Sequence, residues 1–513
     1  MTSELYKSIT PLNRLLITMV VMSATLMQVI DTTIVNVALP HMQGALSASP
    51  DEITWTLTSY LVASAIFMPL TGYLSDRLGR KNYLFISIAG FTFASALCGA
   101  SVTLTELVMF RLLQGMFGAA LVPLSQAIMT DIFPPEERTR AMAIWGVGVM
   151  VGPILGPTLG GYLTDIASWR WTFYVNVPVG ILTLLLMNII PDTPRRHRHL
   201  DWVGVLLICT SIGGLQYVID RGNSVDWFAS SSIQFATYLT ITSFVGFILH
   251  QFSDTKERVF DIAIFKDKNF TISSLLLCIV GLGLYGTMVI QPLMMEGLLN
   301  YPVLTTGLLL APRGISGMVS MAVVTVLAKY FDPRWIIFGG ILICTAGIWV
   351  GTFYSLYVDT YWLVWPMILQ GFGMGMIFVP LSTIAFSTLP QALRTEAAGL
   401  YSLLRTIGGS IGISIAITIF TRRSQVFWNE LGGGINIYNP AVFHYLQPLH
   451  LTPTSPLGSA LLSGELMRQS SMLAFVNVYA FIAWAFILMT PLVLMLDKTK
   501  KKTPEPFVPD EKV

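Results

Sequence analysis

The sequence is poor in charge. Only 11% of its 513 residues are Asp, Glu, Lys or Arg, whereas an average soluble protein carries about 25%. Hydrophobic residues make up 54% of the chain, so its charged residues are too few to cover a soluble body of this size. The net charge of +2 gives no basic field that would favour nucleic acid. These features exclude a soluble enzyme and indicate a polytopic membrane protein.

Residues that build covalent, metal or nucleotide sites are also scarce. The four cysteines all lie in apolar runs and the six histidines do not cluster, so we expect neither a disulfide scaffold nor a metal site. The sequence contains no Gly-x4-Gly-Lys-Ser/Thr loop, so nothing predicts that ATP drives the protein. We therefore expect no enzymatic activity and no cofactor.

Long apolar runs, separated by Pro, Gly or charged residues, recur along the whole chain. A membrane-spanning helix needs about 20 mostly apolar residues, and fourteen runs meet this requirement. They lie near 14–39, 54–74, 82–101, 105–130, 140–163, 172–190, 202–219, 233–252, 270–295, 304–328, 335–356, 361–388, 396–420 and 471–496. The sequence therefore predicts an all-α polytopic membrane protein with fourteen spans.

Lys and Arg are distributed unevenly over the loops between these runs. Short cytoplasmic loops collect positive charge, and most of the 30 Lys and Arg residues fall in alternate loops, including 77–81 and 498–502. Three others, Arg111, Arg313 and Arg405, lie within apolar runs. Both termini are therefore predicted to be cytoplasmic, which agrees with an even number of spans.

Short strings from the first half of the chain return about 256 residues later. Leu-Gln-Gly occurs at 113–115 and 369–371, Arg-Thr-x-Ala at 138–141 and 394–397, and glycines 152 and 156 recur as 408 and 412. Repeated halves are typical of transporters, whose substrate site lies near the midplane where the halves meet. The predicted organisation is an N-terminal six-helix bundle (1–192), two inserted helices (193–260), a C-terminal six-helix bundle (261–498) with a long periplasmic loop (about 422–470), and a disordered cytoplasmic tail (499–513).

Asp31 is an acid inside the first apolar run, where a charged side chain costs roughly 2.5–3.5 kcal/mol. Gln28, Thr32 and Asn36 recur at helical spacing around it and share one face of the helix. Such a face should line water or another polar helix, so we regard these three residues as candidates for a cavity. Two interpretations stay open for Asp31: a structural hydrogen-bond network, or a carboxyl group that binds and releases a proton during transport.

Arg111, in the fourth run, is the expected counter-charge of Asp31. It begins a polar stripe that continues with Gln114. The pair is either permanent and structural, or Arg111 competes with a proton for the carboxylate and makes protonation a switch. Gln114 is a candidate for the substrate cavity, and three further candidates are Gln126, Gln370 and Arg405. Arg313 and Glu296 also lie in or near spans, and the sequence assigns them no role.

Glycine, proline and charge recur at fixed spacing in two other segments. The loop after the second run contains Gly72, Asp76, Arg77, Gly79 and Arg80, in which glycine permits close packing and basic residues anchor the cytoplasmic face. The fifth run has small residues at every fourth position and two prolines that bend the helix. These residues are Gly148, Gly152, Pro153, Gly156, Pro157, Gly160 and Gly161. We expect this glycine face to pack against the other half of the molecule, although ordinary helix packing also explains it.

Together these segments resemble a known family. Residues 72–81 resemble the signature loop of the major facilitator superfamily, 111–120 resemble its fourth-span motif, and 148–161 resemble the antiporter motif of its proton-coupled drug exporters. Residues 30–40 and 169–180 resemble motifs of the fourteen-helix drug:H+ antiporter branch. Within that branch the chain looks most similar to EmrB-type multidrug exporters.

The resemblance implies a fold and a function. The fold would be a major facilitator fold of two six-helix bundles with two inserted helices. The function would be proton-coupled antiport that exports bulky hydrophobic or amphipathic compounds across a bacterial inner membrane by alternating access, with Asp31 and Arg111 in proton coupling. EmrB-type exporters work with a periplasmic adaptor and an outer-membrane channel, so the segment 422–470 is either a dock for that adaptor or a solvated flap. The alternatives are a metabolite importer or uniporter, and a membrane sensor or scaffold without transport.

Overall fold

The structure is a computed structural model, and it describes residues 9–48, 50–134, 137–192, 201–252, 262–390, 393–436 and 438–497. Every regular element in this part of the chain is a helix. The expected disordered tail at 499–513 lies outside the described residues.

The first half of the chain forms the helices that correspond to the first six predicted spans. They are α2 (Pro11–Ala45), α3 (Pro50–Ile53), α4 (Trp55–Phe67), η1 (Met68–Leu70), α5 (Thr71–Leu78), α6 (Arg80–Ala100), α7 (Leu104–Gly118), α8 (Leu121–Ile132), α9 (Arg138–Ile166), α10 (Trp171–Tyr174), α11 (Asn176–Leu186) and η3 (Met187–Ile189).

The two inserted helices and the second half follow. The inserted part contains α12 (Trp202–Gly222), η4 (Asn223–Val225), η5 (Trp227–Ala229) and α13 (Ser231–Phe252). The second half contains η6 (Ile262–Lys266), α14 (Lys268–Gly297), α15 (Val303–Tyr330), α16 (Pro333–Val350), η7 (Gly351–Phe353), α17 (Thr360–Ser387), α18 (Arg394–Gly432), α19 (Pro440–Leu446), η9 (Gln447–Leu449) and α20 (Pro456–Leu494).

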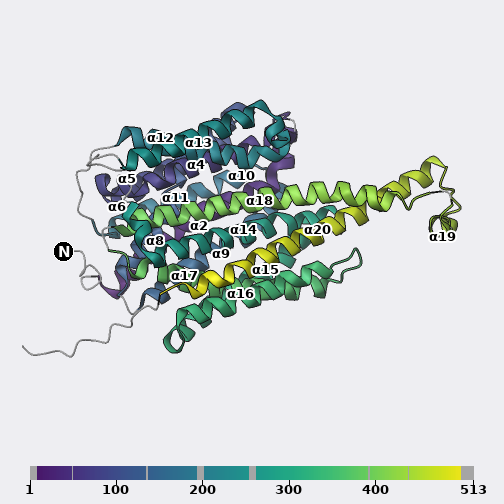
Figure 1. The fold of residues 1–513 in the computed structure, drawn as a ribbon. Coiled ribbons are helices and arrows are strands. Elements are labelled where there is room, and N and C mark those ends of the chain that lie inside the picture. The colour runs from purple at the N-terminus through teal and green to yellow at the C-terminus, as the bar shows by residue number, and fades with distance from the viewer. Residues whose placement is uncertain are drawn as a thin grey trace, which may run out of the picture.

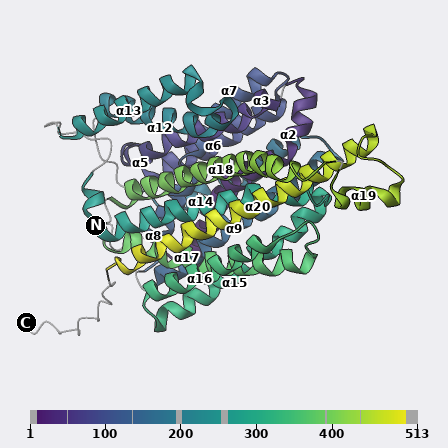
Figure 2. The same cartoon turned by 45° about the vertical axis from the view of Figure 1, so that its right-hand side comes forward.

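The long helices run side by side, so the bundle has two ends (Figure 1). At one end, which we call the terminal face, α2 begins and α20 ends. There the backbone N–H of Asp497 donates to the Asn269 side chain, and Arg334 donates to the carbonyl oxygen of Leu496. At the other end, which we call the hairpin face, α18 and α20 project beyond their neighbours and carry α19 between them (Figures 1 and 2). On the outside of the bundle, α12 packs beside α4 and α18, and α13 packs on α12.

Thirteen helical segments in the described part of the chain are long and apolar enough to cross a membrane. The predicted fifth span is not in this set, because several side chains of its helix lie outside the described residues. Its helix α9 nevertheless has 29 residues, or about 43 Å of helix, and it lies against α2 on one side and α15 on the other. We therefore count α9 as the fourteenth spanning helix.

Side-chain caps in the sequence explain where several spans begin. Thr103 and Glu106 form a reciprocal capping box at the start of α7. Asp267 accepts from the backbone N–H of Phe270 before α14, and Asp332 accepts from that of Arg334 before α16. Each cap satisfies a backbone N–H that the helix itself leaves without a partner. Short polar residues at the membrane boundary therefore fix the ends of the helices.

The glycine face of α9 packs within its own half, which corrects the expectation that it packs against the other half. A Cβ atom on Gly152 would overlap Val29, one on Gly156 would overlap Thr33, and one on Gly160 would lie 2.7 Å from the carbonyl oxygen of Ile34. All of these neighbours belong to α2, because small residues every fourth position let two helix backbones approach closely. Contact between α9 and the other half comes from different residues, such as Gly146, where a Cβ would lie 3.0 Å from Met321 of α15.

The outer segment predicted at 422–470 is mostly helix rather than loop. Helices α18 and α20 each have 39 residues, or about 58 Å, which exceeds the roughly 30 Å hydrocarbon core of a bilayer. The turn between them packs around a small core of its own, made by Val442, Leu446 and Leu462. A groove of about 480 Å³ lies beneath it, between the ends of the two helices.

Candidate functional site

Asp31 and Arg111 meet inside the N-terminal bundle. Asp31 lies on α2 and Arg111 on α7, and the Arg111 guanidinium donates to the Asp31 carboxylate at 2.6 Å. Both side chains are fully buried. Arg111 lies about two turns into α7, so the pair sits deep in the bundle toward the hairpin face. The proximity expected from the sequence is present, while the role of the pair in proton coupling stays a prediction.

Neutral amide groups complete the shell around the carboxylate. Gln114 donates to Asp31 at 2.8 Å and accepts from Arg111 at 2.7 Å, so it bridges the two charges. Asn176, at the start of α11, donates to the same Asp31 oxygen at 3.0 Å. The amide of Gln114 also donates to the hydroxyl of Ser95 on α6. Helices α7 and α11 therefore hold the carboxylate that α2 carries, α6 supports Gln114, and each of these groups is at most 3% exposed.

Aromatic rings and backbone hold the guanidinium from its other sides. The Arg111 guanidinium lies 4.3 Å from the centre of the Tyr60 ring and 5.6 Å from that of Phe173. Its Nε–H donates to the carbonyl oxygen of Thr56 at 2.9 Å. An ion pair so completely shielded from water is stable only while both charges remain paired, because an unpaired ion in a buried site costs several kcal/mol. A proton on Asp31 would weaken the pairing, so the geometry suits a site that is sensitive to protonation.

The other polar residues of α2 do not share this environment, which corrects the expectation of a single polar face. Gln28 is buried and accepts from the backbone N–H of Val122 on α8. The Thr32 hydroxyl donates to the carbonyl oxygen of Val29 in its own helix, and Asn36 is exposed. Only Gln28 and Asp31 of this set contact other helices through side-chain hydrogen bonds.

A second buried polar cluster lies in the C-terminal bundle. Arg313 on α15 donates to the Gln291 side chain at 3.0 Å and to the Thr287 hydroxyl at 2.9 Å, both on α14. Gln291 in turn donates to Gln370 on α17 at 3.2 Å, and Gln370 donates to the carbonyl oxygen of Gly347. The structure therefore places Gln370, a cavity candidate, inside this cluster, and it gives Arg313 neutral partners. Glu296 lies one residue before the end of α14.

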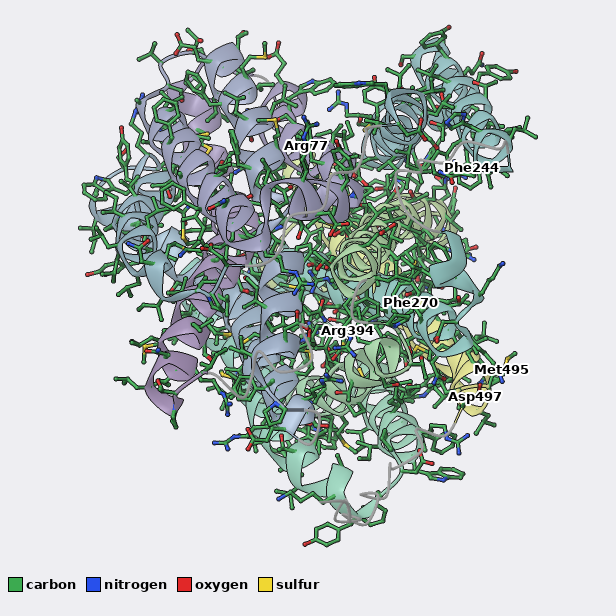
Figure 3. All side chains as sticks on the ribbon, turned by 90° about the vertical axis from the view of Figure 1, so that its left-hand side faces the viewer. Arg77, Phe244, Phe270, Arg394, Met495 and Asp497 are labelled. Atoms are coloured by element: carbon green, nitrogen blue, oxygen red, sulfur yellow. The ribbon has the colours of Figure 1, made fainter. Side chains whose placement is uncertain are left out.

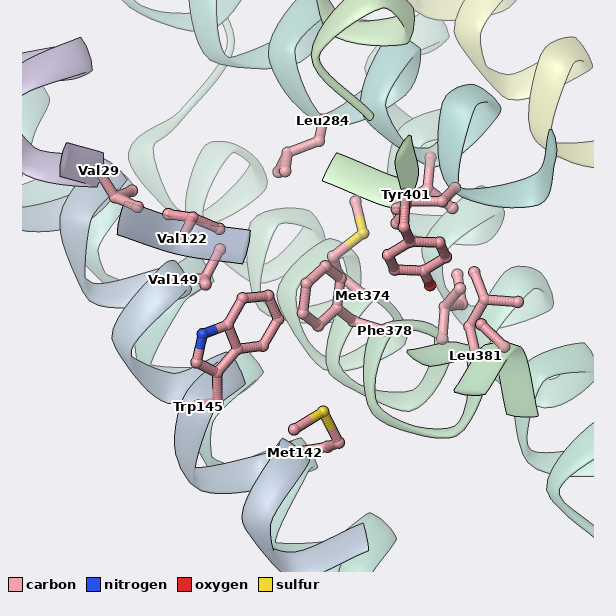
Figure 4. Close-up of a cluster of buried hydrophobic side chains, with 14 of the residues drawn as sticks. Val29, Val122, Met142, Trp145, Val149, Leu284, Met374, Phe378, Leu381 and Tyr401 are labelled. Atoms are coloured by element: carbon pink, nitrogen blue, oxygen red, sulfur yellow. The ribbon is translucent and has the colours of Figure 1, made fainter. Parts of the chain in front are cut away.

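Around Trp145 and Phe378 the contact between the two bundles is apolar. The rings of Trp145 on α9 and Phe378 on α17 stack with centroids 5.7 Å apart and planes 16° apart. Met142, Val149 and Met374 are buried in the same cluster (Figure 4). Soft and aromatic side chains of this kind adapt to hydrophobic compounds of different shape. The two other cavity candidates, Gln126 on α8 and Arg405 on α18, are buried, and both Gln126 side-chain polar atoms and the Arg405 Nε lack a hydrogen-bond partner among the described residues.

At the terminal face a charged contact joins the two halves. Asp131 on α8 pairs with Arg80 at the start of α6 and lies 3.8 Å from Arg394 at the start of α18. Figure 3 shows Arg77 and Arg394 on this face. Arg77 donates to the Tyr73 hydroxyl, while Asp76 is half-buried on the same helix. The halves therefore touch through charge at this end, and the contact must break if the cavity is to open there.

The motif residues themselves pack tightly. A Cβ on Gly72 would lie 2.8 Å from the Cα of Glu396 on α18, so this glycine lets the two halves approach. Gly79 has a positive φ of 82°, which glycine adopts without strain, and it separates α5 from α6. Gly148 is buried and Gly161 is half-buried, whereas the side chains of Pro153 and Pro157 lie outside the described residues.

Sequence reasoning missed several members of these clusters. Asn176 was visible within the segment 169–180 but carried no assigned partner, and nothing in the pattern links it to Asp31. Asp131 lies near the end of a predicted span, where acids are common, and Thr287 is one of many hydroxyl residues within the spans, so neither stood out in the sequence. The 256-residue repeat supplies a signal for Thr287, because that residue lies 256 positions after Asp31.

Comparisons with known proteins agree with this architecture. The family model of the Major Facilitator Superfamily matches residues 21–413. The chain is 34% identical to "Multidrug export protein EmrB" of Escherichia coli (strain K12), over 92% of this chain and 93% of that protein. It is 33% identical to "Probable multidrug resistance protein EmrY" of the same organism, over 93% of this chain and 94% of that protein.

A solved structure supports the fold. The proton:xylose symporter XylE, 14% identical, superimposes with a TM-score of 0.60 over 95% of this chain and 100% of that chain. A match at this identity speaks for the fold alone. With fourteen spanning helices, the internal repeat and the family match over most of its length, the chain belongs to the Major Facilitator Superfamily.

Proposed function

We infer that the protein is a multi-pass inner-membrane transporter that exports structurally diverse small molecules, as the name of its relative EmrB, a multidrug export protein, indicates for that protein. Members of this family are transporters and not enzymes. The apolar contact between the halves, centred on Trp145 and Phe378, supports hydrophobic or amphipathic substrates. Rocking of the two bundles about this contact would open it to one side of the membrane at a time.

We further propose that the proton gradient drives export, without a cofactor. The observation that carries this proposal is the buried Asp31–Arg111 pair with its amide shell. A proton that enters on Asp31 would release Arg111, and the loss of the proton would restore the pair, so each proton crossing would be linked to a change of packing between α2 and α7. One charge moved through 100 mV supplies about 2.3 kcal/mol, which corresponds to a roughly fifty-fold concentration ratio.

The decisive experiment measures substrate-linked proton flux in liposomes that contain the purified protein. Asp31→Asn keeps the shape and the hydrogen bonds but fixes the neutral state, so it should abolish uphill export driven by a pH gradient while substrate binding persists. Asp165→Asn makes the same chemical change at an exposed residue and should behave as the wild type. Coupled export by Asp31→Asn would show that the proton travels through another group.

We also propose an orientation and a partner. The predicted concentration of Lys and Arg at the terminal face supports a cytoplasmic position for that face and a periplasmic one for the hairpin of α18, α19 and α20. This hairpin projects far beyond the other helices (Figure 1) and has its own small core. Such a stable projection is suited to hold a periplasmic adaptor that leads to an outer-membrane channel.

Replacing 430–465 by a short Gly/Ser linker tests the role of the hairpin. The spans keep their packing in this variant, so proton-coupled transport in liposomes should be retained, whereas resistance of cells should fall to the level of a host without the protein. Cells that keep full resistance with the shortened hairpin would exclude it as the dock for the adaptor.

A further inference from the structure

In the part of the chain that the structure describes, the C-terminal bundle holds the Arg313 guanidinium without a carboxylate partner. Among the described residues, the hydrogen-bond acceptors of the Arg313 side chain are the Thr287 hydroxyl and the Gln291 carboxamide, both uncharged. The ionisable groups near enough to influence it are Cys344 and Tyr479, which are neutral at ordinary pH. A buried cation in this situation is costly, and a membrane interior makes it more so.

The surroundings show that this cation does not reach the lipid headgroups. Arg313 lies about three turns into α15, or roughly 15 Å from its beginning. Its neighbours come from α14 (Thr287, Gln291), α16 (Cys344) and α20 (Tyr479). These helices enclose the side chain within the C-terminal bundle. Thr287 and Gln291 are each 1% exposed, while Arg313 keeps a partly accessible surface.

The internal repeat shows that the C-terminal cluster lacks a carboxylate at the position equivalent to Asp31. At the 256-residue offset Asp31 corresponds to Thr287 and Gln114 corresponds to Gln370, and all four lie in the two buried clusters. In the first half the guanidinium meets the Asp31 carboxylate. In the second half the equivalent position offers a hydroxyl, which can donate to an anion but supplies no negative charge.

We propose that Arg313, Thr287 and Gln291 form a binding site for a monovalent anion, which supplies the charge that the second half lacks. The guanidinium gives a fork of N–H donors that fits a carboxylate. The Thr287 hydroxyl donates to the carbonyl oxygen of Gly283 and the Gln291 amide donates to Gln370, so each would turn toward a bound anion to donate to it. This inference rests on the proposed transport function. The anion is either the carboxylate of an amphipathic substrate or an inorganic ion such as chloride, since both present the same charge to the same donors.

The first arm of the test compares substrates that share one tail and differ in the head group. Export of dodecanoate and dodecyltrimethylammonium is measured from liposomes containing wild-type protein, Arg313→Gln or Arg313→Lys. If a carboxylate is the ligand, Arg313→Gln should raise the KM for dodecanoate about tenfold without changing that for dodecyltrimethylammonium, and Arg313→Lys should restore part of the loss. Arg468→Gln removes an exposed arginine from α20 and should leave both values unchanged.

The second arm tests an inorganic anion. Export of dodecyltrimethylammonium is measured with chloride replaced by gluconate on both sides of the membrane. If chloride is the ligand, the wild type should lose export in gluconate and recover it as chloride is added, while Arg313→Gln should be indifferent to chloride. A selective loss of dodecanoate or a chloride dependence that vanishes in Arg313→Gln supports the site and names its ligand.

The same measurements can overturn the proposal. Equal losses for both substrates in Arg313→Gln and Arg313→Lys, together with wild-type export that does not depend on chloride, would assign Arg313 a structural role. Failure of the proposed function would look different, because wild-type protein would then export neither substrate against its gradient.

Discussion

The two halves of the molecule use a buried arginine in opposite ways. In the N-terminal bundle Arg111 is held by a carboxylate at 2.6 Å, a bridging glutamine and two aromatic rings. In the C-terminal bundle Arg313 is held by a hydroxyl and an amide, both neutral. The first cluster is balanced in charge and the second carries a net positive charge. At the 256-residue offset, the glutamine therefore occurs in both halves and the acid in only one.

The difference suggests that the two clusters bind different ions. A carboxylate next to a guanidinium has two states, protonated or paired, and is suited to a driving ion. A guanidinium held by neutral acceptors has no charged partner among the described residues and is suited to an anion from outside. In the proposed mechanism the proton and the anion act on different helices, and rocking of the two bundles links their effects.

The largest difference in stability between the two halves should appear when each buried arginine is replaced in turn. Arg111→Gln leaves Asp31 buried without a counter-charge, which should lower stability by about 3–5 kcal/mol unless the carboxyl takes up a proton. Arg313→Gln removes a cation that has no carboxylate partner, so the loss should be below ~1 kcal/mol. Thermal unfolding of the purified proteins, followed by size-exclusion chromatography, measures the loss of stability in both variants.

A matched double variant separates charge from packing. Asp31→Asn combined with Arg111→Gln removes both charges and should recover most of the stability lost by Arg111→Gln alone. If the double variant is as unstable as the single one, the lost packing of Arg111 on Tyr60 and Phe173 explains the effect, and the contrast between the halves is one of shape.

A smaller loss of stability is expected when a glycine that packs against a neighbouring helix is replaced by alanine. A Cβ at Gly412 would overlap the backbone of Leu282 on α14, whereas one at Gly156 would first meet the side chain of Thr33 on α2. Backbone moves less readily than a side chain, so Gly412→Ala should cost about 2–3 kcal/mol and Gly156→Ala about 1 kcal/mol. Gly297→Ala, with nothing within 4 Å of its added Cβ, is the control. Equal melting temperatures for the first two variants would contradict this ranking.

The sequence predicts the helices and their repeat well, because apolar length and the 256-residue offset are properties of the chain itself. It also predicts that Asp31 and Arg111 are partners, since two opposite charges within spans of one bundle have few other ways to be satisfied. It does not predict that the glycine face of α9 packs on α2, because close packing looks the same for any neighbour. Nor does it predict the length of the hairpin, because Asn, Gly and Pro near 433–456 mark a turn without showing that both spans continue as helix toward it.

The smallest and most specific effect, a change in anion dependence alone, should follow from giving the second half a carboxylate like that of the first. Thr287→Asp places a carboxylate at the position equivalent to Asp31, where the present hydroxyl lies 2.9 Å from the Arg313 guanidinium. This internal anion should displace the external one. The KM for dodecanoate should rise about threefold to tenfold, or chloride dependence should disappear, while export of dodecyltrimethylammonium in chloride stays near the wild-type rate. Thr287→Ser keeps the hydroxyl and should change neither. If Thr287→Asp exports dodecanoate as well as the wild type and keeps any chloride dependence, the second cluster does not work by charge, and the comparison between the two halves would have to be drawn from their packing alone.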